Sequence, residues 1–240
     1  MFSVLPSVTA LFVESLAALL PAFFLLRYIY RQDQVEKEPP RLLRQLFWLG
    51  CLSALCALAL ELVANRMLDA MVAPDDPRYV YLLAFLVIAA VEEGAKLFFL
   101  RRRTWDERHF NYRFDGIVYA VFVSLGFAAL ENILYILGNG LSVALPRALL
   151  AVPAHMGFGV FMGYFYSRAR LRKHRRKKRG VWVNMTLGYL SALFLHGFYD
   201  ACALKGTPTA TALFVIFVVG MYQIVYRMIR REAATDMPVY

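Results

Sequence analysis

The chain has 240 residues, of which 60% are hydrophobic and 18% are charged, and its mean hydropathy is +0.51. Soluble chains are about 45 to 50% apolar and about 25% charged. This composition argues against a cytoplasmic enzyme, a nucleic-acid-binding module and a disordered tail. The three cysteines, Cys51, Cys56 and Cys202, are too few for a disulfide scaffold or a cysteine zinc site. We therefore interpret the chain as a membrane protein.

Seven apolar segments are long enough to cross a bilayer, which takes a helix of about 20 residues for roughly 30 Å of hydrocarbon. In chain order they lie near residues 7–29, 45–65, 79–100, 116–137, 146–166, 181–203 and 209–229. No small-residue cleavage site follows the first segment, so we expect a retained helix rather than a signal peptide. We predict an all-α, polytopic transmembrane helical bundle of seven spans, forming one integral membrane domain over residues 1–240.

The basic residues indicate the orientation of this bundle. The chain has 27 Lys and Arg and a net charge of +10. Twenty-two of them follow the odd-numbered spans, four follow the even-numbered spans, and Lys96 lies inside span three. Cytoplasmic loops carry the excess of Lys and Arg, so we predict an outer N-terminus and a cytoplasmic C-terminus. The basic run 172–179 is also suited to nucleic acid or acidic lipid, but topology accounts for it and we expect no nucleic-acid partner.

The segments between the spans are too short to hold a separate catalytic domain, because none exceeds about 16 residues. The sequence has no internal repeat that would indicate an inverted-repeat transporter. Any chemistry is therefore expected inside the bilayer. We place the catalytic core at about residues 79–203.

Charged side chains deep in a span destabilise insertion by about 2.5 to 3.5 kcal/mol each, so they are rare unless they pair or function. Glu14 and Glu61 stand alone and are consistent with snorkelling or helix contacts. The other seven ionisable groups in the spans are Glu92, Glu93, Lys96, Glu131, His155, His196 and Asp200. These seven are the candidates for function.

Spans three and four each carry acidic groups with a partner one helical turn away. Glu92 and Lys96 are spaced i,i+4 and are able to neutralise each other. This pairing does not explain why a second carboxylate, Glu93, lies beside them. A carboxylate held at this depth is suited to accept a proton from water. In span four, Glu131 and Tyr135 share one face, and the Tyr135 hydroxyl is placed to stabilise the carboxylate or an oxyanion.

Spans five and six each carry a histidine. His155, Gly159 and Gly163 line one stripe of span five, where small residues let another helix approach the imidazole. In span six, His196 and Asp200 share a face at i,i+4, a spacing by which one helix offers two ligands to a metal ion. Each signal is weak alone.

Together these groups suggest a catalytic metal site. Two imidazoles and several carboxylates on separate helices are the ligands that Zn²⁺ takes in catalytic sites, with a further Glu free to act as base. At about 1.5 Å per residue, Glu92 lies about 12 Å from the cytoplasmic end of its span, His155 about 16 Å, and Glu131 and His196 about 22 Å. The groups share the middle layer, with Glu92 nearest the cytoplasm.

The four constellations, taken in order, resemble the four motifs of the PrsW family of intramembrane proteases, which is related to the CAAX prenyl protease and bacteriocin-immunity superfamily. The matching elements are Glu92-Glu93-x-x-Lys96, Phe127-x-x-x-Glu131-x-x-x-Tyr135, His155 with Gly159 and Gly163, and His196-x-x-x-Asp200. The resemblance covers roughly residues 90–203. The segment Asp33 to Pro39 also resembles a Glu-Pro element of that family.

This resemblance implies a membrane-embedded metalloprotease of the kind that makes the first, site-1 cut in an anti-sigma factor during envelope-stress signalling. Position by position, Glu92 and Glu93 match the paired glutamates of the family. Glu131 matches its second-motif acidic residue, where the CAAX relatives have a histidine. His155, His196 and Asp200 match the remaining polar positions.

We thus expect an intramembrane endopeptidase of the plasma membrane that cuts a single-span membrane protein. His155 and His196, with Glu131 or Asp200 or both, would hold a Zn²⁺ ion and its water. Glu92 or Glu93 would accept the proton of that water, Lys96 would balance their charge, and Tyr135 would stabilise the oxyanion.

Two other functions compete with this interpretation. A CAAX-type prenyl-protein endopeptidase would favour a cavity open to the cytoplasm. A proton- or cation-coupled transporter would use the same Asp, Glu and His side chains as a relay. A scaffold without catalysis is the remaining alternative.

Overall fold

The computed structural model describes residues 8–240, and over this range the chain is helical apart from short connections and one isolated bridge between Tyr112 and Pro238. The predicted all-α fold is confirmed. Six helical segments are long and apolar enough to cross a membrane. They are α1 (Val8–Gln32), α2 (Pro40–Met71), α5 (Arg113–Asn139), the run Leu141–His174 that ends in α7 (Val152–His174), α8 (Lys178–Lys205) and α9 (Pro208–Ala234).

The third predicted span is helical too, but its composition differs from that of the other six. It consists of α3 (Tyr79–Leu82), the π-helical segment η1 (Leu83–Ala89) and α4 (Ala90–Thr104), which follow one another without a break. Glu92, Glu93 and Lys96 lie in its middle, and because of these charges it is less apolar than the six helices named above. It packs against α2 and α8 inside the bundle.

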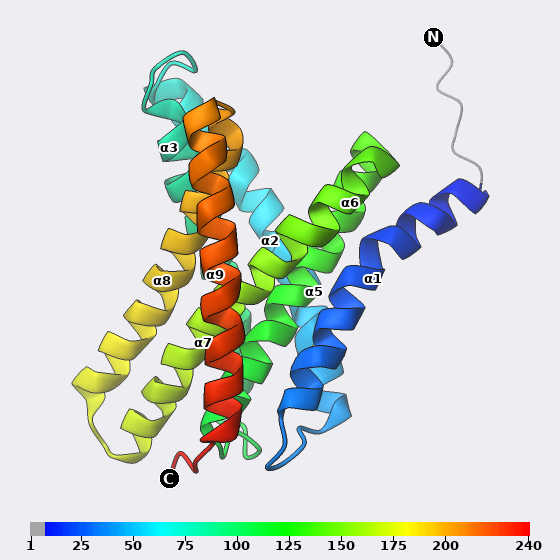
Figure 1. Ribbon diagram of the computed structural model, residues 1–240. Coiled ribbons are helices and arrows are strands. Elements are labelled where there is room, and N and C mark those ends of the chain that lie inside the picture. The colour runs from blue at the N-terminus through cyan, green and yellow to red at the C-terminus, as the bar shows by residue number, and fades with distance from the viewer. Residues whose placement is uncertain (1–7) are drawn as a thin grey trace.

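The helices lie side by side and run up and down the bundle (Figure 1). The connections from α1 to α2 and from α7 to α8, together with the end of α9, lie at the lower end of Figure 1. The start of α1 and the connections from α2 to α3 and from α8 to α9 lie at the upper end. We call the lower end the basic end and define it by residues 27–44, 101–113, 168–179 and 227–240, which carry 22 of the 27 Lys and Arg.

α5 forms the centre of the bundle, and its residues Phe114 to Ala129 are all buried. Because these consecutive residues are buried on every side of the helix, other helices surround this part of α5. Glycines allow the closest contacts, since a methyl group on Gly163 of α7 would overlap the backbone oxygen of Gly116 in α5. Small residues at such crossings let two backbones approach within a membrane. These contacts fix α7, and therefore His155, against α5.

Local sequence explains where several helices begin, end or bend. α1 bends along its length in Figure 1, and Pro21 inside it removes a hydrogen bond and displaces the preceding turn. α8 ends at Lys205 because Gly206 adopts a left-handed conformation with φ of 62°. α9 then begins at Pro208, and the Thr207 side chain accepts a hydrogen bond from the Ala210 N–H.

A second π-helical segment, η3 (Arg147–Ala151), precedes α7 and the histidine that α7 carries. It follows the short η2 (Leu141–Val143) and α6 (Ala144–Pro146). Pro153 has no N–H to donate to the Leu149 carbonyl, and the Tyr222 hydroxyl of α9 donates to it instead at 3.0 Å. π-Helical turns are frequent at functional sites, and here η1 and η3 each lead into a helix that bears candidate site residues.

Candidate active site

Three charged side chains of α4 form a buried cluster. The Lys96 ammonium donates to Glu93 Oε1 at 2.7 Å and to Glu92 Oε2 at 3.2 Å. It also lies 3.9 Å from the centre of the Phe127 ring on α5, a cation–π contact. All three charged residues are buried. The predicted i,i+4 pair of Glu92 and Lys96 is present, and Glu93 makes the shorter contact.

His155 of α7 lies between this cluster and α5. Its Nδ1 is 3.1 Å from the Lys96 ammonium, and its Nε2 is 2.9 Å from Glu131 Oε2. The ring packs against Phe158 with 5.7 Å between ring centres. The imidazole is therefore held on both nitrogens by side chains that come from two other helices.

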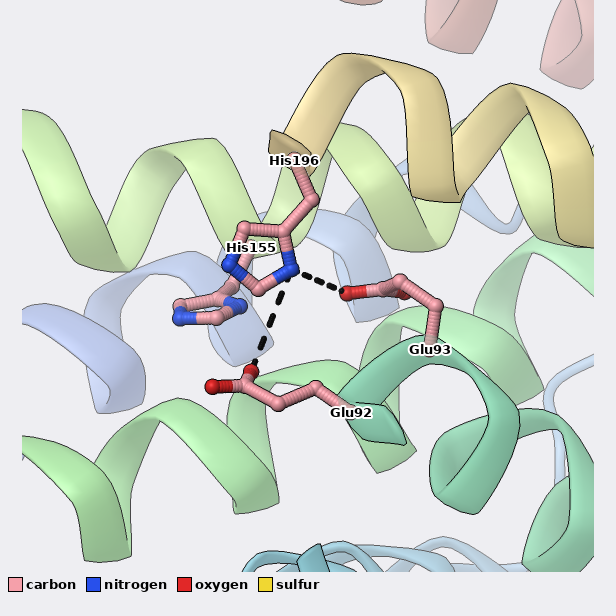
Figure 2. Close-up of side chains that lie close together, drawn as sticks. All are labelled: Glu92, Glu93, His155 and His196. Carbon is pink, nitrogen blue, oxygen red and sulfur yellow. Dashed lines mark hydrogen bonds and ion pairs between the residues drawn. The ribbon is translucent and has the colours of Figure 1, made fainter. Parts of the chain in front are cut away.

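His196 of α8 is also held on both nitrogens, by one side chain from α4 and one from α8 itself. Its Nδ1 is 2.9 Å from Glu93 Oε1, and its Nε2 is 3.3 Å from Asp200 Oδ2. The ring stacks on Phe158 at 4.8 Å and lies 5.2 Å from the His155 ring. Figure 2 shows His196 facing the two glutamates, with Glu92 and Glu93 approaching from α4.

A cavity of about 570 Å³ opens beside these groups. Glu92, Glu131, His155, His196 and Asp200 all line it. Most of its remaining wall is apolar, with side chains from α2, α5, α7, α8 and α9. The structure thus brings the predicted residues of four separate spans to one hollow within the bundle.

The sequence placed Glu92 nearer the cytoplasmic end of its span than the other site residues. In the structure its side chain nevertheless lines the same cavity as Glu131, His155 and His196. Its Oε2 lies 3.9 Å from His196 Nδ1. The helices therefore pack so that these side chains meet, although they stand at different distances from their helix ends.

Comparison with known proteins identifies the family. The family model described as PrsW family intramembrane metalloprotease matches residues 38–226. The chain belongs to this family. It is 35% identical over 220 residues to Protease PrsW of Oceanobacillus iheyensis, covering 91% of this chain and 96% of that protein. It is 35% identical over 184 residues to Protease PrsW of Bacillus subtilis, covering 77% and 79%. No solved structure matches the chain.

The protein is therefore an intramembrane protease and a multi-pass integral membrane protein. The predicted PrsW resemblance and enzyme class are confirmed. The PrsW family is described as a family of metalloproteases, which raises the question of whether these side chains suit a metal ion.

The donor atoms of this PrsW-family chain suit a divalent metal in type and separation. One ligand atom from each of Glu92, Glu93, His155 and His196 lies within 4.8 Å of the others, and all four residues are buried. Two ligands of one tetrahedral Zn²⁺ at about 2.0 to 2.2 Å each are roughly 3.4 Å apart, so modest side-chain movement closes the set. Glu93 Oε2 is buried and makes no hydrogen bond.

The charge of the PrsW site suits a metal as well. More carboxylates than cations line or adjoin the cavity. The five carboxylates are Glu61, Glu92, Glu93, Glu131 and Asp200, and the two cationic side chains are Lys96 and Arg147. With ionised carboxylates and neutral histidines, three formal negative charges remain. Unpaired buried charges are strongly destabilising, and a divalent cation would offset most of them.

The metal ligands predicted from the sequence include the carboxylates of Glu131 and Asp200. The four residues that lie closest together in the structure instead include the carboxylates of Glu92 and Glu93. Glu131 and Asp200 each contact the Nε2 of one histidine, whereas the Nδ1 atoms of the two rings face Lys96 and Glu93. Both sets contain His155 and His196. The division of the carboxylates between metal binding and proton transfer stays a prediction.

Tyr135 also lines the cavity, and two residues that the sequence did not indicate lie there with it. They are Arg147 of η3 and Glu61 of α2. Arg147 reads in the sequence as a loop charge on the outer face, and Glu61 reads as a lone carboxylate in span two. Arg147 lies eight residues before His155, at the start of the same span, and this proximity is the signal that could have revealed it.

Proposed function

We propose that this protease hydrolyses a peptide bond of a single-span membrane protein, such as an anti-sigma factor, within the bilayer by metal-activated water. The observation that carries the proposal is the meeting of the paired glutamates and both histidines at one cavity formed by the membrane helices. Membership of the PrsW family supports proteolysis over a transporter or a prenyl-protein endopeptidase.

His155 and His196 are the proposed imidazole ligands, and the metal is proposed to be zinc. Their carboxylate co-ligands come from Glu131 and Asp200, which contact the Nε2 atoms, or from the glutamates of α4. When bound, such an ion polarises a peptide carbonyl and lowers the pKa of a coordinated water to about 7.

Glu92 is the proposed general base. It lines the cavity with 5% of its surface exposed, whereas Glu93 is 0% exposed and lies behind the cavity wall. A base must reach the proton that it accepts, which favours Glu92. Glu93 instead anchors the Lys96 ammonium and the His196 ring. Lys96 balances the charge of both glutamates.

Tyr135 is proposed to stabilise the developing oxyanion, because its side chain lines the cavity on the Glu131 side. A hydroxyl directed at the charge that forms during hydrolysis lowers the barrier. The apolar cavity wall would receive the side chains of the substrate segment.

We further propose that the chain crosses the membrane seven times with its C-terminus in the cytoplasm. Two features support this proposal: the helix formed by α3, η1 and α4 spans the same bundle as the other six, and α1 starts at the end opposite to the end of α9 (Figure 1). The basic loops gather at the C-terminal end, as the positive-inside bias requires.

The test is cleavage of a single-span anti-sigma factor by purified protein in proteoliposomes. We expect Glu92→Gln to lower the cleavage rate at least about 100-fold, because the amide cannot accept the proton. Its metal content should equal that of the wild type.

The control is Glu14→Gln, which makes the same change in α1 away from the cavity and should cleave normally. Cleavage by Glu92→Gln at the wild-type rate would contradict the role of Glu92. Cleavage by His155→Ala at the wild-type rate would contradict the proposed function itself.

A further inference from the structure

Arg147 provides a second, half-buried cation at the site, and unlike Lys96 it lines the cavity. Its side chain is 14% exposed, and its Nη2 lies 2.9 Å from Glu131 Oε2. Its Nε donates to Asn132 Oδ1 at 2.7 Å, and its guanidinium carbon lies 3.8 Å from the centre of the Tyr135 ring. One guanidinium therefore contacts three side chains at once.

The chain fold explains why these three partners are all on α5. α5 ends at Asn139, and the chain turns back through η2 and α6 to begin η3 at Arg147. In this antiparallel hairpin Arg147 lies eight residues after the end of α5, and Glu131 lies eight residues before it. Tyr135 is one turn along the same helix face as Glu131. The hairpin thus places Arg147 opposite the carboxylate.

Glu131 connects Arg147 to His155. The same oxygen, Oε2, lies 2.9 Å from Arg147 Nη2 and 2.9 Å from His155 Nε2. Asn132, the hydrogen-bond partner of Arg147 Nε, is itself held by its side-chain N–H donating to the Ala18 carbonyl of α1 at 2.8 Å. Arg147 is therefore anchored to the wall of the bundle, and the Glu131 carboxylate is held between an anchored cation and the imidazole.

We propose that Arg147 is a positioning residue of the protease: it holds the Glu131 carboxylate in the orientation that fixes the ring of His155. The proposal rests on the proposed function, since it requires His155 to work in hydrolysis. Partners of this kind behind a metal-binding imidazole set the ring orientation, and their loss typically costs about 10- to 100-fold in activity or metal affinity.

The geometry requires arginine rather than any cation. The planar guanidinium donates a hydrogen bond through Nε to Asn132 and forms an ion pair through Nη2 with Glu131, while its face lies on Tyr135. A lysine ammonium is a point charge that supplies the charge but not this fixed orientation. Arg147→Lys should therefore restore part of what Arg147→Gln loses.

The test uses two readouts, one of which needs no substrate. The first is the visible absorption spectrum of the protein loaded with Co²⁺, which reports the surroundings of the ion. The second is cleavage of a single-span anti-sigma factor in proteoliposomes, separated into kcat and KM. We compare wild type, Arg147→Gln, Arg147→Lys, Glu131→Gln and the double variant Arg147→Gln/Glu131→Gln, with Arg78→Gln as the matched control. Arg78 pairs with Asp76 at the surface, outside the cavity.

We expect Arg147→Gln to change the Co²⁺ spectrum and to lower kcat about 10- to 100-fold with KM within about twofold of wild type. Arg147→Lys should lose less, and it carries the test if Arg147→Gln does not fold. In the Glu131→Gln background the loss of Arg147 should add no more than about twofold, because residues that act through one another are not additive. Arg78→Gln should match wild type.

Two results would overturn the proposal. Arg147 variants that match Arg78→Gln in both readouts would show that the residue positions nothing. A full additional loss of kcat in the Glu131→Gln background would show that Arg147 acts independently of Glu131. Failure of the proposed function is distinguishable, because then His155→Ala would keep the wild-type spectrum and cleavage rate.

Discussion

The i,i+4 spacing of Glu92 and Lys96 predicts an ion pair one helical turn apart, and the structure has it at 3.2 Å. Contacts within one helix follow from its period, so sequence spacing is enough to predict them. The contact between Glu93 and His196 joins residues 103 positions apart. Only the packing of α4 against α8 creates that contact, and spacing along the chain contains no information about it.

Arg147 is a residue whose role the sequence did not predict. Its position next to a predicted loop assigned it to the outer face, because the sequence gives no indication that η3 begins at this residue. The hairpin between α5 and α7 turns its side chain inward to Glu131. The closeness of Arg147 to His155 along the chain could have marked it as a candidate, but its contact with Glu131 depends on the path of the turn, which tertiary contacts determine.

Glu38 at the basic end is predicted to make stability depend on pH. Its carboxylate is buried and accepts a hydrogen bond from the Tyr119 hydroxyl at 2.6 Å. Burial raises the pKa of Glu38 from 4.5 to about 7. The folded protein therefore binds a proton that the unfolded chain has already lost over this interval, so stability is full below about pH 4.5 and falls as the pH rises through about 7.

The variant Glu38→Gln stays neutral at every pH and should lose this dependence. We expect its melting temperature to exceed that of wild type by a few degrees at pH 8, with the gap closing at pH 4.5. The control is Glu36→Gln, an exposed position in the same loop, which should melt with the wild type at both pH values. A Glu38→Gln protein with the wild-type pH profile would refute this explanation.

At the scale of elements, hydropathy located the helices well but not their arrangement. All seven predicted segments are helical over the residues that the structure describes, which begin at Val8. Which helix lies at the centre does not follow from hydropathy, because apolar residues face lipid and protein alike in a membrane. The central place of α5 depends on its close crossings with neighbouring helices, and only the small-residue stripe of α7 indicated one of them. The π-helical segments were not predicted. At η3, the Tyr222 hydroxyl of α9 lies within hydrogen-bond distance of the Leu149 and Leu150 carbonyls, a long-range contact that spacing along the chain does not indicate.

The crossing of α5 and α7 predicts a sharp difference between two glycines. Gly163→Ala places a methyl group against the backbone of Gly116, which cannot move aside without separating the helices. We expect a destabilisation of roughly 1 to 3 kcal/mol, typical of overpacking, measured by thermal unfolding in detergent.

Gly220→Ala is the matched control on α9, where a Cβ would meet nothing within 4 Å. It should be neutral or stabilise the helix by up to about 1 kcal/mol. If both variants melt at the same temperature, the close crossing contributes nothing to the stability of the bundle.

At the scale of the whole molecule, the candidate site exists only in the assembled bundle. Its lining residues come from α2, η1, α4, α5, α6, η3, α7 and α8, over residues 54–204 together with Phe214 of α9. The predicted catalytic core of about residues 79–203 covers most of these positions. Glu61 on α2 lies outside that core, because a single carboxylate in an apolar segment has no partner in the sequence that indicates its direction. The order of the four motifs along the chain is enough to predict the protease family from the sequence.

The metal content of the purified protein tests the central claim most directly. We predict about one divalent metal ion per chain in wild type, as expected for a single catalytic site, and at least a tenfold lower content in both His155→Ala and His196→Ala. His109→Ala, which changes a histidine in the α4–α5 loop that contacts Glu107, should retain the wild-type content. Equal metal content in all four proteins would contradict the claim that these two histidines hold the catalytic ion.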